Sequence, residues 1–416
     1  MPNAFATVDW LMQESLDLLV NKLAIGAMFN TEVQREFERD FAPGETVRVK
    51  FPQEYLIRSG LSFNAQNLNR RTTTVTCDQI FGVHFQWDAY EKAISLERGE
   101  AILSKEYIEP AAAQMAQEIE SRCAEWATLH ASNIVGDGTN PTSFDACSAA
   151  ARQRLVELGC PMMGKERGIF VPPVVMRALK NAAIGYFNPV TDLNKQWRQG
   201  IVGSGDNFDW YESMSLYEHT IGTWDAAGVT VNDTVASGDT SITVTCTTGD
   251  TFLAGNVISI ADVLPVNPRT RRAFGTTARQ FRIRTTTTGA ASAATLDIAP
   301  TIYGPGSEYQ NVDALPVNGA ALTLMPGTTT PNGETPLTGL AIGPDAFALV
   351  GVKFDQPPEG GNIVISRQLR DDETGISLAL LRYFDGDERQ WRTRMDTCIG
   401  FGDLWSDHNA VRLQFA

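Results

Sequence analysis

Histidine is scarce in this sequence, and its few copies are not spaced for catalysis or metal binding. The chain of 416 residues has 4 histidines, which are His84, His130, His219 and His408. None has a second histidine four residues on, and neither H-E-x-x-H nor G-x-S-x-G occurs. A zinc site or a hydrolytic triad usually shows such a signature. We therefore expect no catalytic residue, no metal site, no cofactor and no enzyme activity.

Closely spaced cysteines are also missing. The chain has 6 cysteines and no C-x-x-C pair; they are Cys77, Cys123, Cys147, Cys160, Cys246 and Cys398. Zinc ligands come in close pairs because two of them must converge from one turn. A disulfide framework is typical of small secreted chains. The sequence therefore predicts buried free thiols in a reducing compartment.

Positive charge is in short supply. Lysine and arginine number 34 against 49 acidic residues, so the net charge is 34 − 49 = −15, and no lysine lies between Lys195 and Lys353. A protein that coats nucleic acid needs cations to meet phosphates, so this class is not favoured. No apolar run approaches the roughly 20 residues that span a bilayer. The first residues show no basic segment followed by an apolar one, so neither a membrane span nor a signal peptide is expected.

One stretch comes close to a phosphate-binding loop. Residues 159–166 read G-C-P-M-M-G-K-E, with Glu166 where that motif needs serine or threonine for magnesium. The stretch follows a predicted helix, whereas a phosphate-binding loop follows a strand. We interpret Gly159 as the glycine that ends the helix.

The first hundred residues predict a helix and then a long hairpin. Apolar spacing favours a helix over residues 9–28. Residues 46–51 alternate as a strand, and residues 72–76 and 80–87 resume the strand pattern after a long polar tip. In the last of these, His84 points away from the face that Val83 and Phe85 share. A tip of this length suggests a role outside its own subunit.

The next segment alternates helices and strands. Residues 110–134 predict the longest helix, with Pro110 at its first position and apolar residues three and four apart. A helix over 147–158, a strand over 168–171 and a helix over 173–183 follow. This alternation is typical of a mixed α/β domain.

Composition changes near residue 226. Residues 226–344 hold 23 threonines, with glycine and proline turns at short spacing. Short strands are predicted in this stretch, at 240–245, 257–260, 281–285, 294–298 and 321–325. The pattern indicates a self-contained all-β module, either a barrel or a sandwich. Later strands are predicted at 347–354, 362–366, 376–383 and 390–399, so the module interrupts an α/β domain.

This order of elements resembles the Hong Kong 97 capsid fold of tailed bacteriophages, and most closely the coat proteins of short-tailed Salmonella-type phages, which carry an inserted β-barrel. The stretches that carry the resemblance are Ala111–Ile119 continuing to Val135, Gly249–Gly255, Leu296–Pro300 followed by Tyr309–Val312, and Arg392–Asp396 with Gly400–Gly402. The resemblance covers most of the chain, and the order and spacing of the stretches carry it. It implies an α+β fold with a spine helix at 110–134.

The resemblance also implies a division into domains. We expect an N-terminal arm, an extended loop, a peripheral domain with the spine helix, an axial α/β domain, an inserted all-β domain, a second axial part, peripheral strands and a C-terminal axial strand. Their respective ranges are 1–45, 46–90, 91–136, 137–225, 226–344, 345–360, 361–400 and 401–416.

The implied function is a virion structural protein that self-assembles into an icosahedral shell. The implied partners are copies of the chain in hexamers and pentamers, a scaffolding protein, a portal and possible decoration proteins. The shell would form in the bacterial cytoplasm and enclose DNA without reading its sequence, and an acidic lining would not retain phosphates. Three alternatives stay open: a cellular nanocompartment shell of the encapsulin type, an enzyme with a β-accessory domain, and a secreted surface protein.

Charged residues are the candidate contacts between subunits. We expect Arg70 and Arg71, at the tip of the extended loop, to pair with acidic residues near the base of a neighbour's long helix. The family's inserted domain can bear a long charged bridging loop, but residues 232–239 are short here. Arginines at 269, 271, 272 and 279 form an alternative basic patch. The candidates are Arg58, Arg70, Arg71, Glu97, Glu100, Glu106, Glu109, Arg269, Arg271 and Arg272.

Overall fold

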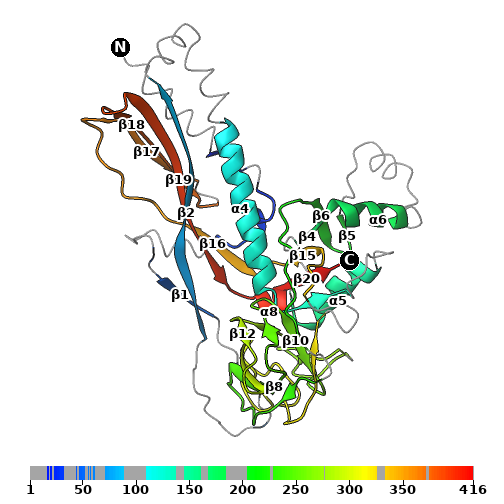
Figure 1. Cartoon of the computed structure of the whole chain (residues 1–416). Coiled ribbons are helices and arrows are strands. Elements are labelled where there is room, and N and C mark those ends of the chain that lie inside the picture. The colour runs from blue at the N-terminus through cyan, green and yellow to red at the C-terminus, as the bar shows by residue number, and fades with distance from the viewer. Residues whose placement is uncertain are drawn as a thin grey trace. The chain divides into compact units, whose positions relative to one another are not determined.

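A computed structural model of the chain describes most of its residues (Figure 1), and they fall into two compact units. Unit 1 comprises residues 1–51, 72–123 and 347–404, and unit 2 comprises residues 52–71, 124–346 and 405–416. The described residues are 16–17, 19–20, 23–31, 44, 46–51, 55, 57, 60, 71–88, 109–136, 145–160, 167–183, 204–224, 228–275, 277–325, 333–371 and 374–415.

Unit 1 is built on an antiparallel sheet in the order β1-β2-β19-β18-β17, with β16 also paired to β19. Its longest ladder joins β2 to β19, from Asp88 opposite Gln390 to Thr76 opposite Phe401. Seventeen residues of β2 extend about 56 Å at the usual rise per residue. The strands are β1 (Thr46–Lys50), β2 (Thr72–Asp88), β16 (Phe347–Gly351), β17 (Ile363–Arg370), β18 (Ser377–Asp385) and β19 (Gln390–Asp403).

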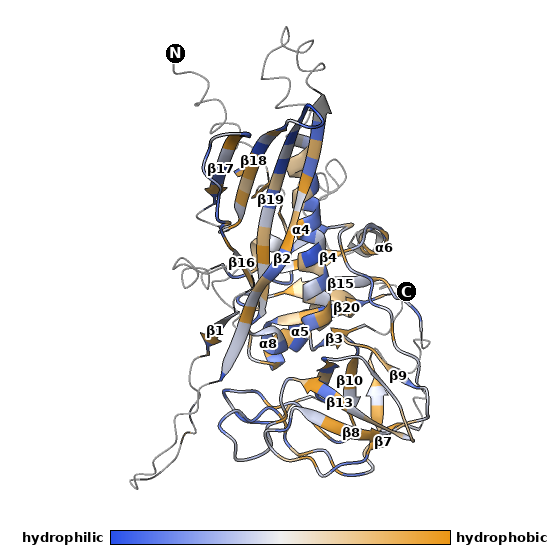
Figure 2. Cartoon of the chain, turned by 60° about the vertical axis from the view of Figure 1, so that its left-hand side comes forward, coloured by the Kyte–Doolittle hydropathy of each residue, from blue (hydrophilic) through white to orange (hydrophobic). Residues whose placement is uncertain are grey.

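The two faces of the β2–β19 ladder differ because side chains alternate along each strand. On one face, Gln79 accepts a hydrogen bond from Arg122 of helix α4 (Glu109–His130) at 2.9 Å, and the Arg122 guanidinium lies 4.5 Å from the Phe81 ring centre. On the opposite face, His84 and Gln86 are exposed. Figure 2 shows the resulting mixture of hydrophilic and hydrophobic residues along β2 and β19.

A buried carboxylate fixes the N-terminal segment of unit 1. Glu120 of α4 accepts hydrogen bonds from the backbone N–H groups of Ala24, Ile25 and Gly26 at 2.6, 3.0 and 3.1 Å. These groups precede and open the 3-10 turn η1 (Gly26–Met28). Burial raises the pKa of Glu120, and the three N–H donors oppose the shift.

Replacing Glu120 by glutamine is expected to destabilise the protein by about 1–3 kcal/mol, because the amide nitrogen would face N–H donors that are left unpaired. Thermal or urea unfolding measures the loss. The control Glu118→Gln, at an exposed ion pair with Arg122 on the same helix, should change the stability by at most about 0.5 kcal/mol.

The raised pKa of Glu120 in the folded protein sets the direction in which stability depends on pH, because the folded state binds the proton more tightly than the unfolded state. The wild type should therefore lose stability relative to Glu120→Gln as the pH rises from 4.5 through the folded pKa. Equal losses in the two variants would contradict this role.

Unit 2 contains a mixed sheet in the order β3-β20-β15-β4-β6-β5. The β20–β3 and β4–β6 pairs are parallel, and the other pairs are antiparallel. Its strands are β3 (Ile134–Val135), β4 (Gly168–Val171), β5 (Ser204–Gly205), β6 (Phe208–Glu212), β15 (Thr338–Ile342) and β20 (Ala410–Gln414). Helices α5 (Ala150–Glu157, continuing the π-helical turn η4, Asp145–Ala149), α6 (Pro173–Ala183) and α8 (Ser406–Asn409) accompany the sheet. Leu155, Val175 and Leu179 from the helices pack with Ile169 and Val411 from the strands in one buried cluster.

Between β6 and β15, the chain of unit 2 forms a closed six-stranded barrel. Its strands run in the order β14-β10-β11-β13-β8-β7. The two end strands meet, since Val231 N–H donates to Ala320 O at 2.8 Å and Leu322 N–H donates to Val229 O at 3.1 Å. The barrel strands are β7 (Thr230–Val231), β8 (Ser241–Thr245), β10 (Val257–Ile260), β11 (Gln280–Ile283), β13 (Ala293–Ala299) and β14 (Leu322–Leu324), and β9 (Thr251–Phe252) pairs with β12 (Thr287–Thr288) beside them.

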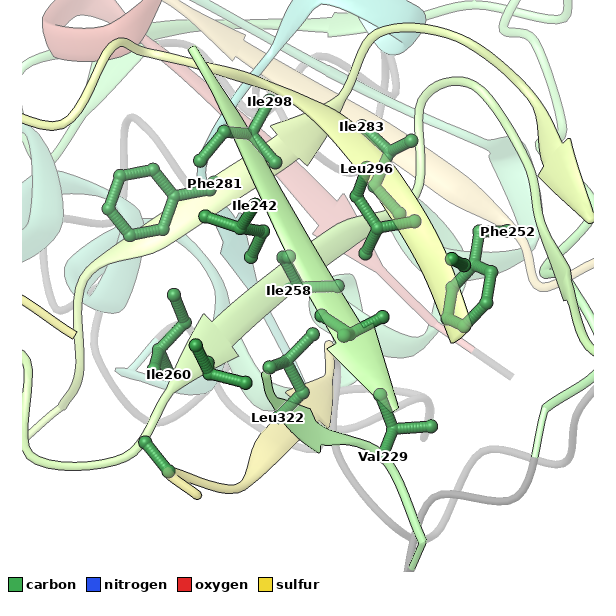
Figure 3. Packing of buried hydrophobic residues seen from close by; sticks show 14 of the residues in the cluster. Val229, Ile242, Phe252, Ile258, Ile260, Phe281, Ile283, Leu296, Ile298 and Leu322 are labelled. Carbon is green, nitrogen blue, oxygen red and sulfur yellow. The ribbon is translucent and has the colours of Figure 1, made fainter. Parts of the chain in front are cut away.

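The barrel has its own apolar core, which explains why a threonine-rich sequence folds there. Inward residues such as Ile242, Ile258 and Leu296 are fully buried and point toward one another (Figure 3). Threonines occupy the alternate, outward positions and pair across strands, as Thr230 Oγ1 and Thr245 Oγ1 do at 2.7 Å. The chain enters and leaves the barrel side by side, because Ile221 N–H donates to Glu334 O at 2.9 Å.

Polar side chains dock the barrel onto the rest of unit 2. The buried amide of Gln280 accepts from Ile134 N–H at 2.7 Å and donates to Ile134 O at 3.0 Å, so it pairs with β3 as a strand residue would. The buried guanidinium of Arg412 in β20 donates to Thr128 O at 3.3 Å and to Gly255 O at 3.0 Å. These contacts tie the barrel to the C-terminal end of α4 and to the mixed sheet.

The structure confirms several predicted elements and corrects others. Strands 168–171 and 257–260 and helix 173–183 lie where predicted, and all six cysteines are buried free thiols. The runs 72–76 and 80–87 are one continuous strand. The long helix ends at His130, four residues early, because Ile134 and Val135 form β3. The described part of residues 9–28 is helical at 16–17 and 19–20, but Gly26–Met28 is a 3-10 turn, and the rest lies outside the described residues.

One strand pairs outside the domain range expected for it. The strand Thr338–Ile342 lies within the range 226–344, yet it pairs with β20 and β4 and not with the barrel. The strand Phe347–Gly351, expected in the axial part 345–360, pairs with residues 399–403 of β19, and its assignment to an axial domain stays a prediction. Gly159 has φ +93° and ends the α5 helix as interpreted, while most of the phosphate-loop-like stretch lies outside the described residues.

Candidate functional site

The predicted contact residues are only partly described. Arg58, Arg70, Glu97, Glu100 and Glu106 lie outside the described residues, and Glu109 opens α4 with a side chain that is also outside them. The four that can be placed, Arg71, Arg269, Arg271 and Arg272, all belong to unit 2. Whether any of the ten contacts a second copy stays a prediction.

Arg71 stands at the root of the extended loop, directly before β2, and not at its tip. Its guanidinium carbon lies 4.6 Å from the ring centre of Tyr309 and 5.7 Å from that of Trp405. A guanidinium over an aromatic face gains about 0.5–2 kcal/mol, more when it is shielded from water. Tyr309 belongs to a barrel loop and Trp405 precedes α8, so this arginine joins the loop root to two other parts of its own unit.

Asp407 of α8 lies near basic side chains from three chain segments. Only 17% of its side chain is exposed, and its Oδ1 is 2.8 Å from His408 Nδ1. Burial alone would raise the pKa of Asp407, but His408, Arg279 and Arg71 outweigh it and hold that pKa well below its usual range. Arg279 is itself 1% exposed, and burial lowers its pKa while Asp407 opposes the shift. The carboxylate therefore compensates a buried arginine.

The loop from Pro265 to Gly275 carries the other placed arginines. Asn267 organises it: its Oδ1 accepts from Arg269 N–H and Thr270 N–H at 3.0 and 3.2 Å, and its Nδ2 donates to Glu157 O at 3.1 Å. Arg271 donates to Ser307 O at 2.7 Å and to Glu308 O at 2.6 Å. Arg269 and Arg272 are exposed. Arg279 is buried, so the prediction of a basic surface patch of four arginines is wrong for this residue.

A cavity of about 680 Å³ opens beside this loop. Its walls come from Pro268–Arg271, from Leu158 and Gly159 after α5, and from Trp405, His408 and Asn409. Tyr55 and Ile57, from the extended loop, complete the lining and are 60% and 94% exposed. Large apolar side chains that are this exposed mark contact surfaces when they gather on one patch.

The exposed face of the β2–β19 ladder holds a second charged group that the sequence did not reveal. Asp396 Oδ1 lies 3.0 Å from His84 Nε2, and Asp396 Oδ2 accepts from Arg394 Nε. The alternation of β2 predicted the orientation of His84 correctly. Its partner depends on the register that sets His84 opposite Arg394, more than 300 residues along the chain, and no local pattern reports that register.

Gly82 is the position that makes room for this group. It stands opposite Asp396 in the ladder, and a Cβ there would overlap Met395 O and Asp396 Oδ1. We expect Gly82→Ala to cost about 1–3 kcal/mol of stability, because backbone and a carboxylate must both shift. Thermal unfolding checks this, with Gly386→Ala as the control, since a Cβ at Gly386 meets nothing within 4 Å. A Gly82→Ala variant as stable as the Gly386→Ala variant would show that the ladder has room for a methyl group at residue 82.

Within the described ranges, no group of three or more histidine, cysteine, aspartate or glutamate side chains is placed to hold a metal ion. None of the helices described is both long and apolar enough to cross a membrane.

Comparison with known proteins gives matches in structure and none in sequence. No family model matches the chain, and no curated protein matches it. Similar solved structures include one from Mycobacterium phage Che8, with 10% identity, 94% of this chain and 90% of that chain covered, and a TM-score of 0.46. The capsid structure of cyanophage P-SCSP1u shares 10% identity over 90% and 84% of the two chains, with a TM-score of 0.41. The capsid of Ralstonia phage GP4 shares 8% identity over 94% and 91%, also with a TM-score of 0.41.

Proposed function

We propose that this chain is the major capsid protein of a tailed double-stranded DNA bacteriophage. It has the Hong Kong 97-like fold with an inserted β-barrel, and copies of it assemble as hexamers and pentamers into an icosahedral shell. The observation that carries the proposal is the sheet of unit 1. There the hairpin strands β1 and β2 join the late strands β17, β18 and β19 beside α4. This joining of early and late segments is what the resemblance in sequence implies.

The net charge of the chain and its exposed apolar side chains also support a capsid function. A chain of net charge −15 repels its own copies at a distance and repels DNA phosphates, so its assembly needs specific contacts and favours a guiding partner such as a scaffold. The DNA is held without sequence readout, and a portal and decoration proteins complete the virion that forms in the host cytoplasm. The extended loop supplies apolar side chains, Tyr55 and Ile57, for a neighbour.

Light scattering of the purified full-length chain, with and without its scaffold, tests the proposal. Particles of megadalton mass are expected, and particles taken from infected cells should protect DNA from nuclease. Particles that hold protein cargo and no DNA would favour the nanocompartment alternative. A chain that stays monomeric in every condition, the scaffold included, would refute a coat function.

A further inference from the structure

One short stretch of the barrel, residues 307–309, contacts Arg71 at the end of the extended loop and also Arg271, the arginine that reaches Tyr55. The backbone oxygens of Ser307 and Glu308 accept from Arg271, and the ring of the next residue, Tyr309, lies under Arg71. Tyr309 is only 8% exposed, and its ring centre is 5.7 Å from that of Tyr303. The stretch is therefore a packed platform and not a free loop tip. We call Arg271, Ser307, Glu308, Tyr309 and Trp405 the seat.

The seat contacts the extended loop at two places: at Tyr55 on the outgoing side, after β1, and at Arg71 on the returning side, directly before β2. On the outgoing side, Arg271 Nη2 lies 3.5 Å from Tyr55 O, and the same nitrogen donates to Glu308 O at 2.6 Å. On the returning side, Arg71 is held between Tyr309 and Trp405, in the field of Asp407. The contact at Tyr55 uses its backbone, so its side chain remains 60% exposed.

The seat is itself fixed to the rest of unit 2. Arg271 has φ +54°, a conformation that an arginine adopts only when its surroundings impose it. Its N–H donates to Asn267 O at 2.8 Å, and Asn267 Nδ2 donates to the last carbonyl of α5, at Glu157. The guanidinium of Arg271 is thus aimed by a turn that α5 anchors.

We infer that the barrel has a positioning function: together with Trp405 it fixes Tyr55 and Arg71, so that the exposed side chains of Tyr55 and Ile57 are held in place to contact a second copy of this chain. Arg71 and Arg271 are positioning residues in this account, and neither needs an acidic partner on the neighbour. The second-copy part of the inference rests on the proposed capsid function, while the seat itself does not. Cation–π contact and charge-assisted hydrogen bonds to carbonyls supply its specificity.

Hydrogen exchange of the unassembled full-length chain tests the seat. In Arg71→Met, and separately in Tyr309→Leu, amide exchange in peptides covering residues 55–60 and 71–74 should be about threefold to thirtyfold faster, the range that loss of one cation–π contact gives. Tyr309→Phe keeps the aromatic ring, so its exchange should stay closer to the wild type than that of Tyr309→Leu. Arg272→Met removes the same charge from an exposed position and should also leave these peptides unchanged.

Two outcomes would overturn the inference. One is equal exchange in Arg71→Met, Tyr309→Leu and Arg272→Met; the other is faster exchange throughout unit 2, which would show general destabilisation. Because the measurement uses unassembled protein, it is independent of whether the chain forms shells. Assembly of Arg71→Met, followed by light scattering, then tests the second-copy part: it should assemble less completely than Arg152→Met, which removes an exposed charge of α5 outside the candidate contacts, and equal assembly would refute that part alone.

Discussion

Replacing Asp407 by asparagine is expected to lower the free energy of unfolding by about 1–3 kcal/mol, because it removes the carboxylate that lies 2.8 Å from His408 and whose charge offsets that of the buried Arg279. Arg279 is 1% exposed, and Asp407 is the group that raises its pKa against burial. Asparagine keeps the shape of the side chain and removes the charge. The loss of stability therefore measures the contribution of the charge of Asp407 and not that of its packing. Urea unfolding of the full chain measures it.

The difference in stability between the wild type and Asp407→Asn is also expected to depend on pH. The folded pKa of Asp407 is held below its usual value of 3.8, so its stabilising effect is complete above pH 3.8 and is lost as the pH falls through the folded pKa. The gap in stability between the wild type and Asp407→Asn should be constant near neutral pH and narrow in acid. Asp297→Asn is the matched control, because Asp297 pairs with Arg284 at the surface and should change stability by at most about 1 kcal/mol. A similar, small loss in both variants would show that Arg279 is compensated elsewhere.

Replacing Gln280 by leucine is expected to lower the free energy of unfolding by about 2–6 kcal/mol, because two buried backbone groups lose their partner together and each such loss costs about 1–3 kcal/mol. Gln280 is 1% exposed and spans Ile134 N–H and Ile134 O. Leucine is similar in size, so the change removes hydrogen bonds with little change in volume. The barrel should keep its own fold, since its core does not include this side chain.

Thermal unfolding by calorimetry and by far-ultraviolet circular dichroism measures the Gln280 effect. We expect the single transition of unit 2 to broaden or divide as the barrel loses its hold on β3. Gln153→Leu, on the exposed surface of α5, should stay within about 0.5 kcal/mol of the wild type. A Gln280 variant that melts like the Gln153 variant would show that other contacts, such as those of Arg412 and Asn267, are sufficient to dock the barrel.

Local patterns predicted the parts of this fold that depend on local physics. Strand 168–171, helix 173–183 and five of the six barrel strands have strong periodicity and clear turns, and they lie at or near their predicted positions; the short strand Thr230–Val231 was not predicted. The strand Thr338–Ile342 was grouped with the barrel because its composition continues the glycine- and threonine-rich texture. All five of its residues are buried, and its partners lie near residues 170 and 412, which composition does not report.

The candidate site was less predictable, because it depends on contacts between distant segments. Arg71 is predicted at the tip of the extended loop, paired with acidic residues of a neighbour, yet it lies directly before β2 and over the rings of Tyr309 and Trp405 of its own chain. Arg279 looked like part of a basic surface patch, yet it is buried beside Asp407. A charged residue in a loop is usually solvated, so only the tertiary structure could show that Arg279 is buried and that Arg71, which is half-buried, stacks on two aromatic rings.

Electron microscopy of the purified full-length chain, assembled with its scaffold, tests the central claim most directly. The account predicts closed shells of uniform size, built of repeated hexamers and pentamers, with the extended loop of each copy in contact with a neighbour. Open sheets, fibres or isolated monomers in the same preparation would contradict the claim that this chain forms a capsid.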